Sequence, residues 1–222
     1  MPVRLVVFDL DGTLVDSRRD LADSANEMLG GYGAPPLTEA AIVRMVGGGA
    51  ATLVTRALAA AHVDTPIENA LARFLTIYDR RLTKHTRPYD GVAGALRELR
   101  EERITTALLT NKPLEQAVAI LRAFDLFKYF PWRVGGDGPW PRKPDPEGLR
   151  FLMDMAQAQP RDTMLVGDSS TDWQTARNAD VRVCLARYGF GFPDLAEGTL
   201  TGEEWLVDHP REIPEVARQA GA

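Results

Sequence analysis

The feature that most constrains this chain is an apolar run near its N-terminus that ends abruptly in two carboxylates. Residues 6–14 read VVFDLDGTL, so that Asp9 and Asp11 follow the run directly and a glycine turn comes next. Such a run, bounded by a turn signal, is typical of a strand buried on both faces. Residues two apart on a strand point the same way, so the two carboxylates can face one point. Because buried like charges need compensation, the pattern predicts a metal ion there.

Composition narrows the class of protein. The 222 residues are 45% hydrophobic and 26% charged, which fits a packed core in one large domain or one domain with an insert. The formal net charge of -5 argues against a nucleic-acid or anionic-membrane partner. No apolar stretch approaches the roughly 18 residues of a membrane span. The few residues before the first strand leave no room for a signal peptide, and the single cysteine, Cys184, lies in a strand-like run, so we expect a cytoplasmic protein.

The hydrophobic pattern divides the chain into two kinds of structure. From residue 15 to about 84 it predicts helices only, with no strand candidate, over residues 17–29, 38–45, 50–61 and 67–82. From residue 87 onward strands are predicted to alternate with helices. The predicted strands are 104–109, 132–134, 163–166, 181–186 and 205–207.

Strands that alternate with helices predict a parallel sheet with right-handed crossovers. The first strand belongs to that series, and the helical block interrupts it. We therefore predict an α/β protein with a doubly wound, Rossmann-like parallel sheet and an inserted helical cap domain. The expected core comprises residues 1–14 and 87–222, and the expected cap comprises residues 15–86.

Polar side chains follow the predicted strands at the points where the strands end. Asp9 and Asp11 follow the first strand, Thr110 and Asn111 follow the second, and Asp168 follows the fourth. In open parallel sheets the ligand crevice lies outside these carboxyl ends. Each segment alone also fits a turn or a helix N-cap, but their shared position favours one site.

Two further residues complete that candidate site. Asp172 comes shortly after the fourth strand, and Lys143 precedes the next predicted helix, although a lysine there also fits a solvated loop. Carboxylates can hold Mg²⁺, while a lysine and a threonine hydroxyl can neutralise phosphoryl oxygens. A carboxylate in line with phosphorus can act as the nucleophile. The residues together predict a site for a divalent cation and a phosphate.

The same residues carry a family resemblance. Residues 9–17, 110–112, 143–144 and 167–172 resemble, in order, the four motifs of the haloacid dehalogenase-like superfamily, and the resemblance covers nearly the whole chain. It implies that Asp9 is the nucleophile and a Mg²⁺ ligand. It implies that Asp11 is the general acid and base, with a backbone carbonyl that touches the metal, and that Asp168 and Asp172 also ligate Mg²⁺, the latter directly or through water.

The phosphate-binding residues that the resemblance implies are Thr110, Asn111 and Lys143. Within the superfamily, residues 46–50, 88–92, 134–137 and 188–191 are similar to the phosphoglycolate phosphatase subgroup, which has a helical cap after the first motif. Trp140 and Trp173 depart from the expected pattern near the rim of the site.

The cap offers weaker candidates. Backbone amides in the run Gly47, Gly48 and Gly49 are expected to reach the distal group of a substrate when the cap closes, although the run also fits a plain turn between helices. Arg44 could bind a substrate carboxylate or lie on the surface. The resemblance favours a Mg²⁺-dependent phosphatase that acts on a small phosphorylated metabolite, with 2-phosphoglycolate as the favoured substrate.

Other functions remain open at this stage. A phosphosugar mutase shares the motifs, and a phospho-ligand sensor would keep the pocket without turnover. Haloacid dehalogenation is disfavoured because Asp11 and the metal-binding acids would have no task in it. The sequence leaves the oligomeric state open between a monomer and a homodimer.

Overall fold

A parallel sheet forms the centre of the molecule. The structure is a computed structural model that describes residues 2–195 and 199–220. Within those residues the sheet has the strand order β5-β4-β1-β6-β7-β8, and every pairing in it is parallel. The strands are β1 (Leu5–Phe8), β4 (Thr105–Leu109), β5 (Trp132–Val134), β6 (Thr163–Gly167), β7 (Arg182–Ala186) and β8 (Trp205–Val207).

The central strand β1 is buried on both faces, as its apolar sequence predicts. Val6 and Phe8 point into one core cluster, whereas Leu5 and Val7 point into another, in the alternation that a strand imposes. Both clusters are built mainly from apolar residues of the neighbouring strands and the covering helices. The sheet therefore separates two apolar layers, and its polar chemistry is confined to the strand ends.

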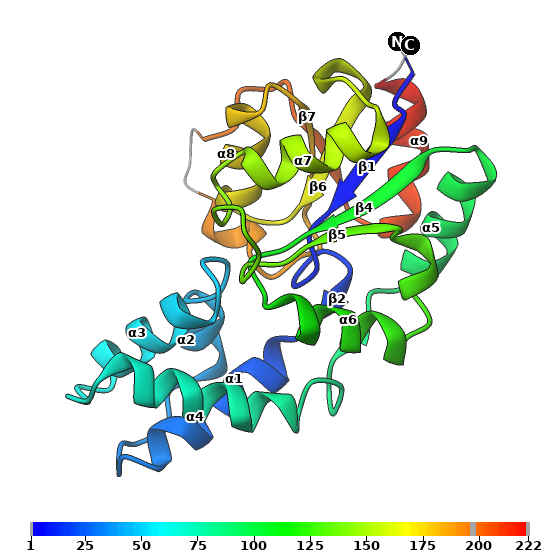
Figure 1. Ribbon diagram of the computed structural model, residues 1–222. Helices are drawn as coiled ribbons and strands as arrows, with labels where there is room; N and C mark the ends of the chain where they lie inside the picture. The colour runs from blue at the N-terminus through cyan, green and yellow to red at the C-terminus, as the bar shows by residue number, and fades with distance from the viewer. Residues whose placement is uncertain (1, 196–198, 221–222) are drawn as a thin grey trace.

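Helices cover both faces of the sheet (Figure 1). On one face lie α5 (Val92–Glu101), α6 (Leu114–Ala123) and α9 (Ile213–Gln219), and on the other lie α7 (Glu147–Ala156) and α8 (Ser170–Asn178). The chain leaves β1 toward β4 and β5 and later returns to β6 on the other side of β1. The predicted fold class, a doubly wound α/β sheet with an inserted helical cap, is confirmed.

Four helices between β1 and β4 have a core of their own, and we call them the cap helices. They lie together at one end of the molecule (Figure 1), and their buried side chains form a third apolar cluster. They are α1 (Arg18–Gly30), α2 (Glu39–Val43), α3 (Ala50–Ala60) and α4 (Ile67–Asp79). The exact division of the chain at residues 14/15 and 86/87 stays a prediction.

The structure corrects one sequence prediction at the base of the cap helices. The stretch from residue 15 was predicted to hold no strand, but β2 (Val15–Asp16) pairs antiparallel with β3 (Arg87–Pro88). Two-residue strands are too short to produce an alternating pattern, which is why the sequence does not reveal them. This two-stranded ribbon joins the segment that enters the cap helices to the segment that leaves them.

A buried carboxylate on the first cap helix also binds the segment by which the chain leaves the cap. Asp20, on α1, is fully buried. Its side chain accepts hydrogen bonds from the backbone N–H groups of His85 and Thr86, at 2.9 and 2.7 Å, and from the Thr86 hydroxyl at 2.8 Å. Without Asp20 the two donors of Thr86 would be buried and unsatisfied.

Two smaller expectations can be settled within the described residues. Cys184 is buried in β7 and free, as predicted for a small apolar residue of a strand. No helix in residues 2–195 and 199–220 combines the length and the apolar character that crossing a membrane requires.

We predict that Asp20→Ala lowers the free energy of unfolding by about 2–4 kcal/mol, because it leaves buried backbone donors without an acceptor. Urea denaturation of the purified protein measures this change. The matched control is Asp23→Ala on the same helix, whose partner Arg19 is exposed, and it should cost less than about 1 kcal/mol. Equal effects of the two substitutions would show that Asp20 has no special structural role.

Candidate active site

The predicted site residues converge at the carboxyl edge of the sheet. Asp9 directly follows β1, Thr110 follows β4 and Asp168 follows β6, and these three strands are neighbours. Lys143 reaches the same edge from the loop that precedes α7. The order of the strands changes sides at β1, since β4 and β5 lie on one side of it and β6, β7 and β8 lie on the other. In doubly wound folds, ligands bind at this position.

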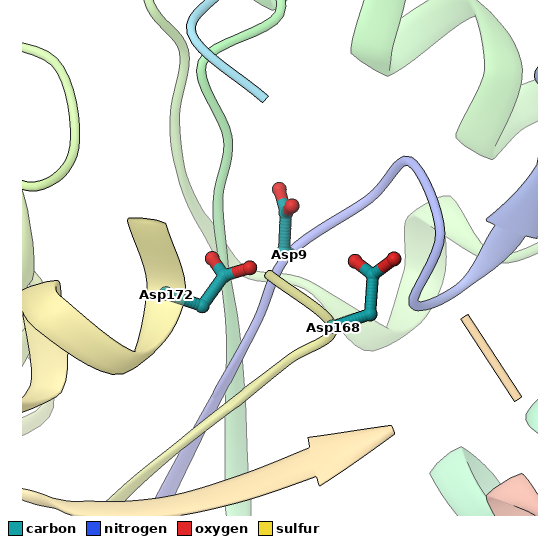
Figure 2. A group of neighbouring side chains, drawn as sticks. All are labelled: Asp9, Asp168 and Asp172. Carbon is teal, nitrogen blue, oxygen red and sulfur yellow. The ribbon is translucent and has the colours of Figure 1, made fainter. Parts of the chain in front are cut away.

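Three carboxylates form a cluster at this edge. Asp9, Asp168 and Asp172 each place a carboxylate oxygen within 4.8 Å of the others, and in Figure 2 Asp9 lies between the other two. All three residues are at most 9% exposed. Burying three acids together is unfavourable unless a cation compensates them, so the cluster fits the donor set of a divalent metal ion.

Each acid is held in place by its neighbours. At the start of α8, Ser169 and Asp172 form a capping box, in which the Ser169 hydroxyl and N–H donate to Asp172 at 2.6 and 3.1 Å. Asp168 accepts hydrogen bonds from the Thr13 hydroxyl at 3.1 Å and from the Gly191 N–H at 2.7 Å. These contacts orient the carboxylates without neutralising them.

Gly12 allows the loop after β1 to approach the cluster. Its backbone has a φ of +87°, and a Cβ at this position would lie 2.0 Å from Asp168 Oδ2. A side chain would therefore meet the carboxylate as well as a strained backbone. The glycine in the first motif is required by the close packing of this loop against Asp168.

Lys143 supplies the positive charge inside the cluster. Its Nζ atom lies 3.0 Å from Asp9 Oδ1 and 2.6 Å from Asp172 Oδ1, and its side chain is 2% exposed. The Asn111 side chain holds the lysine backbone, since its Oδ1 accepts from the Lys143 N–H at 2.9 Å and its Nδ2 donates to the Lys143 carbonyl at 3.0 Å. Asn111 also donates to the Gly47 carbonyl at 2.8 Å, which joins this edge to the cap.

One lysine does not fully compensate three acids. Burial and the neighbouring Asp172 raise the pKa of Asp9 to about 6, against the lowering effect of Lys143. Burial, followed by repulsion from Asp172 and Asp9, raises the pKa of Asp168 well above its usual value. In addition, Asp9 Oδ1 is buried without a well-directed hydrogen bond. The residues present therefore fit a divalent cation, which would supply the missing positive charge.

Asp11 is not part of this carboxylate cluster, although it lines the same cavity as Asp9, and its role stays a prediction. The strand ends at Phe8, and the strict alternation of side chains ends with it. The Asp11 carboxylate accepts from Lys112 Nζ at 2.7 and 2.9 Å and from the Ser17 hydroxyl at 2.6 Å. The two aspartates thus have separate lysine partners.

A small cavity lies between the sheet edge and the cap helices. The sheet edge contributes polar residues to its wall, and the cap contributes mostly apolar residues from α1, α3 and α4. The lining comprises Asp9, Asp11, Thr110, Asn111, Lys112, Pro113 and Gln116 on one side and Leu21, Val46, Gly47, Gly49, Ala50, Leu53, Phe74 and Tyr78 on the other. A small molecule held here would contact Asp9 in the wall at the sheet edge.

The four motifs and this site decide the family. A model of haloacid dehalogenase-like hydrolases matches residues 6–186. The chain belongs to the haloacid dehalogenase-like hydrolase family. Phosphoglycolate phosphatase 1 of Pseudomonas aeruginosa is 39% identical to this hydrolase over an alignment covering 98% of this chain and 80% of that protein.

Two further relatives agree. A phosphoglycolate phosphatase of Pseudomonas putida is 42% identical over 84% of this chain and 70% of its own. The crystal structure of a predicted phosphoglycolate phosphatase from Haemophilus somnus is similar with a TM-score of 0.90 and 28% identity, covering 96% of this chain and 97% of that one. The likeness in sequence and fold therefore extends through both the sheet and the cap helices of this hydrolase.

The cap candidates are only partly brought to the cavity of this haloacid dehalogenase-like hydrolase. Gly47 and Gly49 line it, whereas Gly48 packs against Thr52 and is not among the lining residues. Arg44 is exposed at the end of α2, away from the lining. The structure gives Arg44 the surface position that was the alternative expectation.

The two unexpected tryptophans stabilise the core of the hydrolase and are not among the residues that line the cavity. Trp140 stacks on Phe151 with ring centroids 4.0 Å apart. Trp173 donates its indole N–H to Glu204 at 2.7 Å. These contacts lie on the side of the sheet that α7 and α8 cover.

Lys112 and Tyr78 are among the cavity-lining residues to which sequence reasoning assigned no role. Lys112 adjoins Thr110 and Asn111 in the second motif, and that position was the signal that could have identified it. Tyr78 gave no such signal, because it lies one helical turn after Phe74 on α4 and has the spacing of an ordinary core residue.

We predict that Asp9→Asn raises the melting temperature of the metal-free hydrolase at pH 8 by about 3 °C or more. The pKa of about 6 in the folded protein exceeds the ordinary value of 3.8, so the stability contributed by this carboxyl is present at low pH and lost as the pH rises through 6. The difference between variant and wild type should therefore shrink at pH 5.

Thermal unfolding in the presence of a chelator at both pH values checks this prediction. The control is Asp154→Asn, which removes the same charge from an exposed position on α7 and should leave the melting temperature nearly unchanged. A lower melting temperature for Asp9→Asn at pH 8 would mean that its ion pair with Lys143 outweighs the cost of burial.

Proposed function

We propose that this protein is a Mg²⁺-dependent phosphatase that hydrolyses a small phosphomonoester, with 2-phosphoglycolate as its favoured substrate. The observation that carries this proposal is the cluster of three buried carboxylates with Lys143, of which Asp9 also lines the cavity. Family membership and the names of the relatives support it. The cytoplasmic location expected from the sequence stays a prediction.

In the proposed mechanism, Asp9 is the nucleophile. One of its carboxylate oxygens attacks phosphorus, the bond from phosphorus to the substrate's alcohol oxygen breaks, and an aspartyl-phosphate remains. Lys143, which already lies 3.0 Å from Asp9, holds the nucleophile in place. Mg²⁺ bound by Asp9, Asp168 and Asp172 would neutralise charge on the phosphoryl oxygens.

Asp11 handles the protons in this scheme. It gives a proton to the leaving alcohol oxygen, and then takes one from the water that attacks the phosphorus of the aspartyl-phosphate. In that second step the bond from phosphorus to the Asp9 oxygen breaks, so the reaction releases the alcohol and inorganic phosphate and regenerates both aspartates. Lys112 and Ser17 fix the orientation of the Asp11 carboxylate through three hydrogen bonds.

The hydrogen bonds show which phosphate-binding groups still have donors to offer. The Thr110 hydroxyl oxygen accepts from the Lys112 N–H at 3.2 Å, so its own proton can be donated to a phosphoryl oxygen. Two of the three N–H donors of Lys143 face Asp9 and Asp172, which leaves one. The Asn111 side chain uses both its amide hydrogens and its oxygen within the protein, so we assign it the positioning of Lys143 and of the cap.

We predict that phosphate is released from 2-phosphoglycolate in the presence of Mg²⁺ and that a chelator abolishes this release. Asp9→Asn should lower kcat by about 10⁴-fold or more because the nucleophile is lost. Asp11→Asn should lower it by about 10²–10⁴-fold because proton transfer is lost. A panel of phosphomonoesters, assayed for inorganic phosphate, measures these effects and ranks the substrates.

Asp154→Asn serves as the matched control and should retain wild-type kcat. Product analysis with a hexose 1-phosphate separates hydrolysis from the mutase alternative, since a mutase transfers the phosphoryl group to a sugar hydroxyl instead of water. Thermal stabilisation by 2-phosphoglycolate without any phosphate release would instead support the sensor. Absence of release from every phosphomonoester would overturn the phosphatase proposal.

A further inference from the structure

Two polar groups stand apart in the wall of the cavity, beyond the proposed chemistry of Asp9. On the cap side the wall is mostly apolar, with Leu21, Leu53 and Phe74 among its residues. Among the described lining residues, Tyr78 on α4 has the polar side chain of the cap side, and the ammonium group of Lys112, in the loop after β4, lies over its ring. Their pairing needs an explanation, because apolar walls alone would suffice to exclude water.

The Tyr78 hydroxyl is buried and has no partner within the described residues. Tyr78 is 1% exposed, and its oxygen makes no hydrogen bond in residues 2–195 and 199–220. Its ring stacks on Phe74 with centroids 5.7 Å apart, which fixes its direction. Burying a hydroxyl without a hydrogen-bond partner lowers the free energy of unfolding, so such a group in a native protein needs an explanation. A bound ligand or water that accepts or donates a hydrogen bond is one.

Lys112 lies over the Tyr78 ring and has a third N–H donor that the Asp11 carboxylate does not take. Its Nζ atom lies 4.7 Å from the centre of the Tyr78 ring, and its side chain is 4% exposed. Two of its three N–H donors go to the Asp11 carboxylate. Among the described residues that line the cavity, Lys112 is the only cation.

Tyr78 and Lys112 come from different parts of the fold, and a hydrogen bond between neighbouring residues keeps these parts together. Tyr78 belongs to the cap helix α4, and Lys112 belongs to the loop after β4. Next to them, Gln116 on α6 donates to Asp79 at 2.7 Å, and this bond ties the end of α4 to the sheet side. The bond between Gln116 and Asp79 therefore holds the segments that carry Tyr78 and Lys112 close to each other.

We propose that Lys112 and Tyr78 form the subsite for the carboxylate of the substrate and select phosphomonoesters of small hydroxycarboxylic acids. The inference rests on the proposed function. Lys112 lies within 2.9 Å of the carboxylate of Asp11, the residue that protonates the leaving oxygen. In 2-phosphoglycolate a single carbon separates that oxygen from the carboxylate, so the carboxylate falls beside the spare donor of Lys112 and the hydroxyl of Tyr78.

The test compares two substrates that differ only at this subsite. Both 2-phosphoglycolate and 2-hydroxyethyl phosphate have the same length, but the second has a neutral hydroxymethyl group in place of the carboxylate. We expect wild type to prefer 2-phosphoglycolate in kcat/KM. Tyr78→Phe should lower the ratio of the two kcat/KM values by about tenfold or more, since it removes one hydrogen bond to a charged group.

Two further variants sharpen the comparison. Tyr32→Phe, the matched control, makes the same change at a cap tyrosine that packs under Arg73 and is not a lining residue, so the ratio should stay at the wild-type value. Lys112→Gln should slow both substrates, because Asp11 loses a partner, and should lower the ratio at least as much as Tyr78→Phe. It should also weaken competitive inhibition by glycolate, which carries the carboxylate without a phosphoryl group.

The outcomes distinguish this inference from the proposed function. If wild type releases phosphate but Tyr78→Phe and Lys112→Gln leave the ratio unchanged, the carboxylate subsite is wrong and the phosphatase proposal stands. If wild type already treats the two substrates equally, the same conclusion follows. If neither substrate is hydrolysed, the phosphatase proposal fails and the subsite falls with it.

Discussion

The structure depends on one unfavourable interaction, the crowding of Asp9, Asp168 and Asp172 around a single lysine. Three buried acids within 4.8 Å repel one another, and Lys143 offsets only part of that repulsion. The surrounding fold must hold them in place against this repulsion. The capping box of α8, the Thr13 hydroxyl and the Gly191 amide do so with hydrogen bonds that are aimed at particular oxygens. The rigid, doubly covered sheet fixes the loops that carry these groups.

The same constraint explains why the two aspartates of the first motif differ. Asp9 stays with the acids and shares Lys143, whereas Asp11 turns to Lys112 and Ser17. Two carboxylates two residues apart thus acquire different surroundings because each has its own lysine. Two carboxylates with separate charged partners can take different roles within one site.

The sequence predicts the sheet better than it predicts the cavity, for physical reasons. Long apolar runs and terminal carboxylates mark β1 and β6, because burial on both faces leaves no other composition. The ribbon of β2 and β3 escapes detection because it involves too few residues to have a period. The separate partners of Asp9 and Asp11 depend on the loop that follows the end of the strand at Phe8, and an apolar pattern places that end only within a few residues. Tyr78 has the spacing of a core residue, and only its unpartnered hydroxyl distinguishes it.

The polar groups proposed for the reaction and those proposed for substrate recognition lie in different parts of the cavity. Every group assigned to phosphorus chemistry comes from the sheet edge, where the apolar clusters on both faces hold it rigid. The far end of the cavity is shared between that edge and the cap helices, whose apolar core is a separate cluster. Substitutions on α4 can therefore change the surface that meets the distal part of a substrate without moving Asp9, Lys143 or Asp168. Proteins that share this sheet edge can therefore keep the same chemistry while differences in the cap change which molecules the cavity accepts. In this chain, Tyr78 is the cap residue whose ring lies next to the cation Lys112.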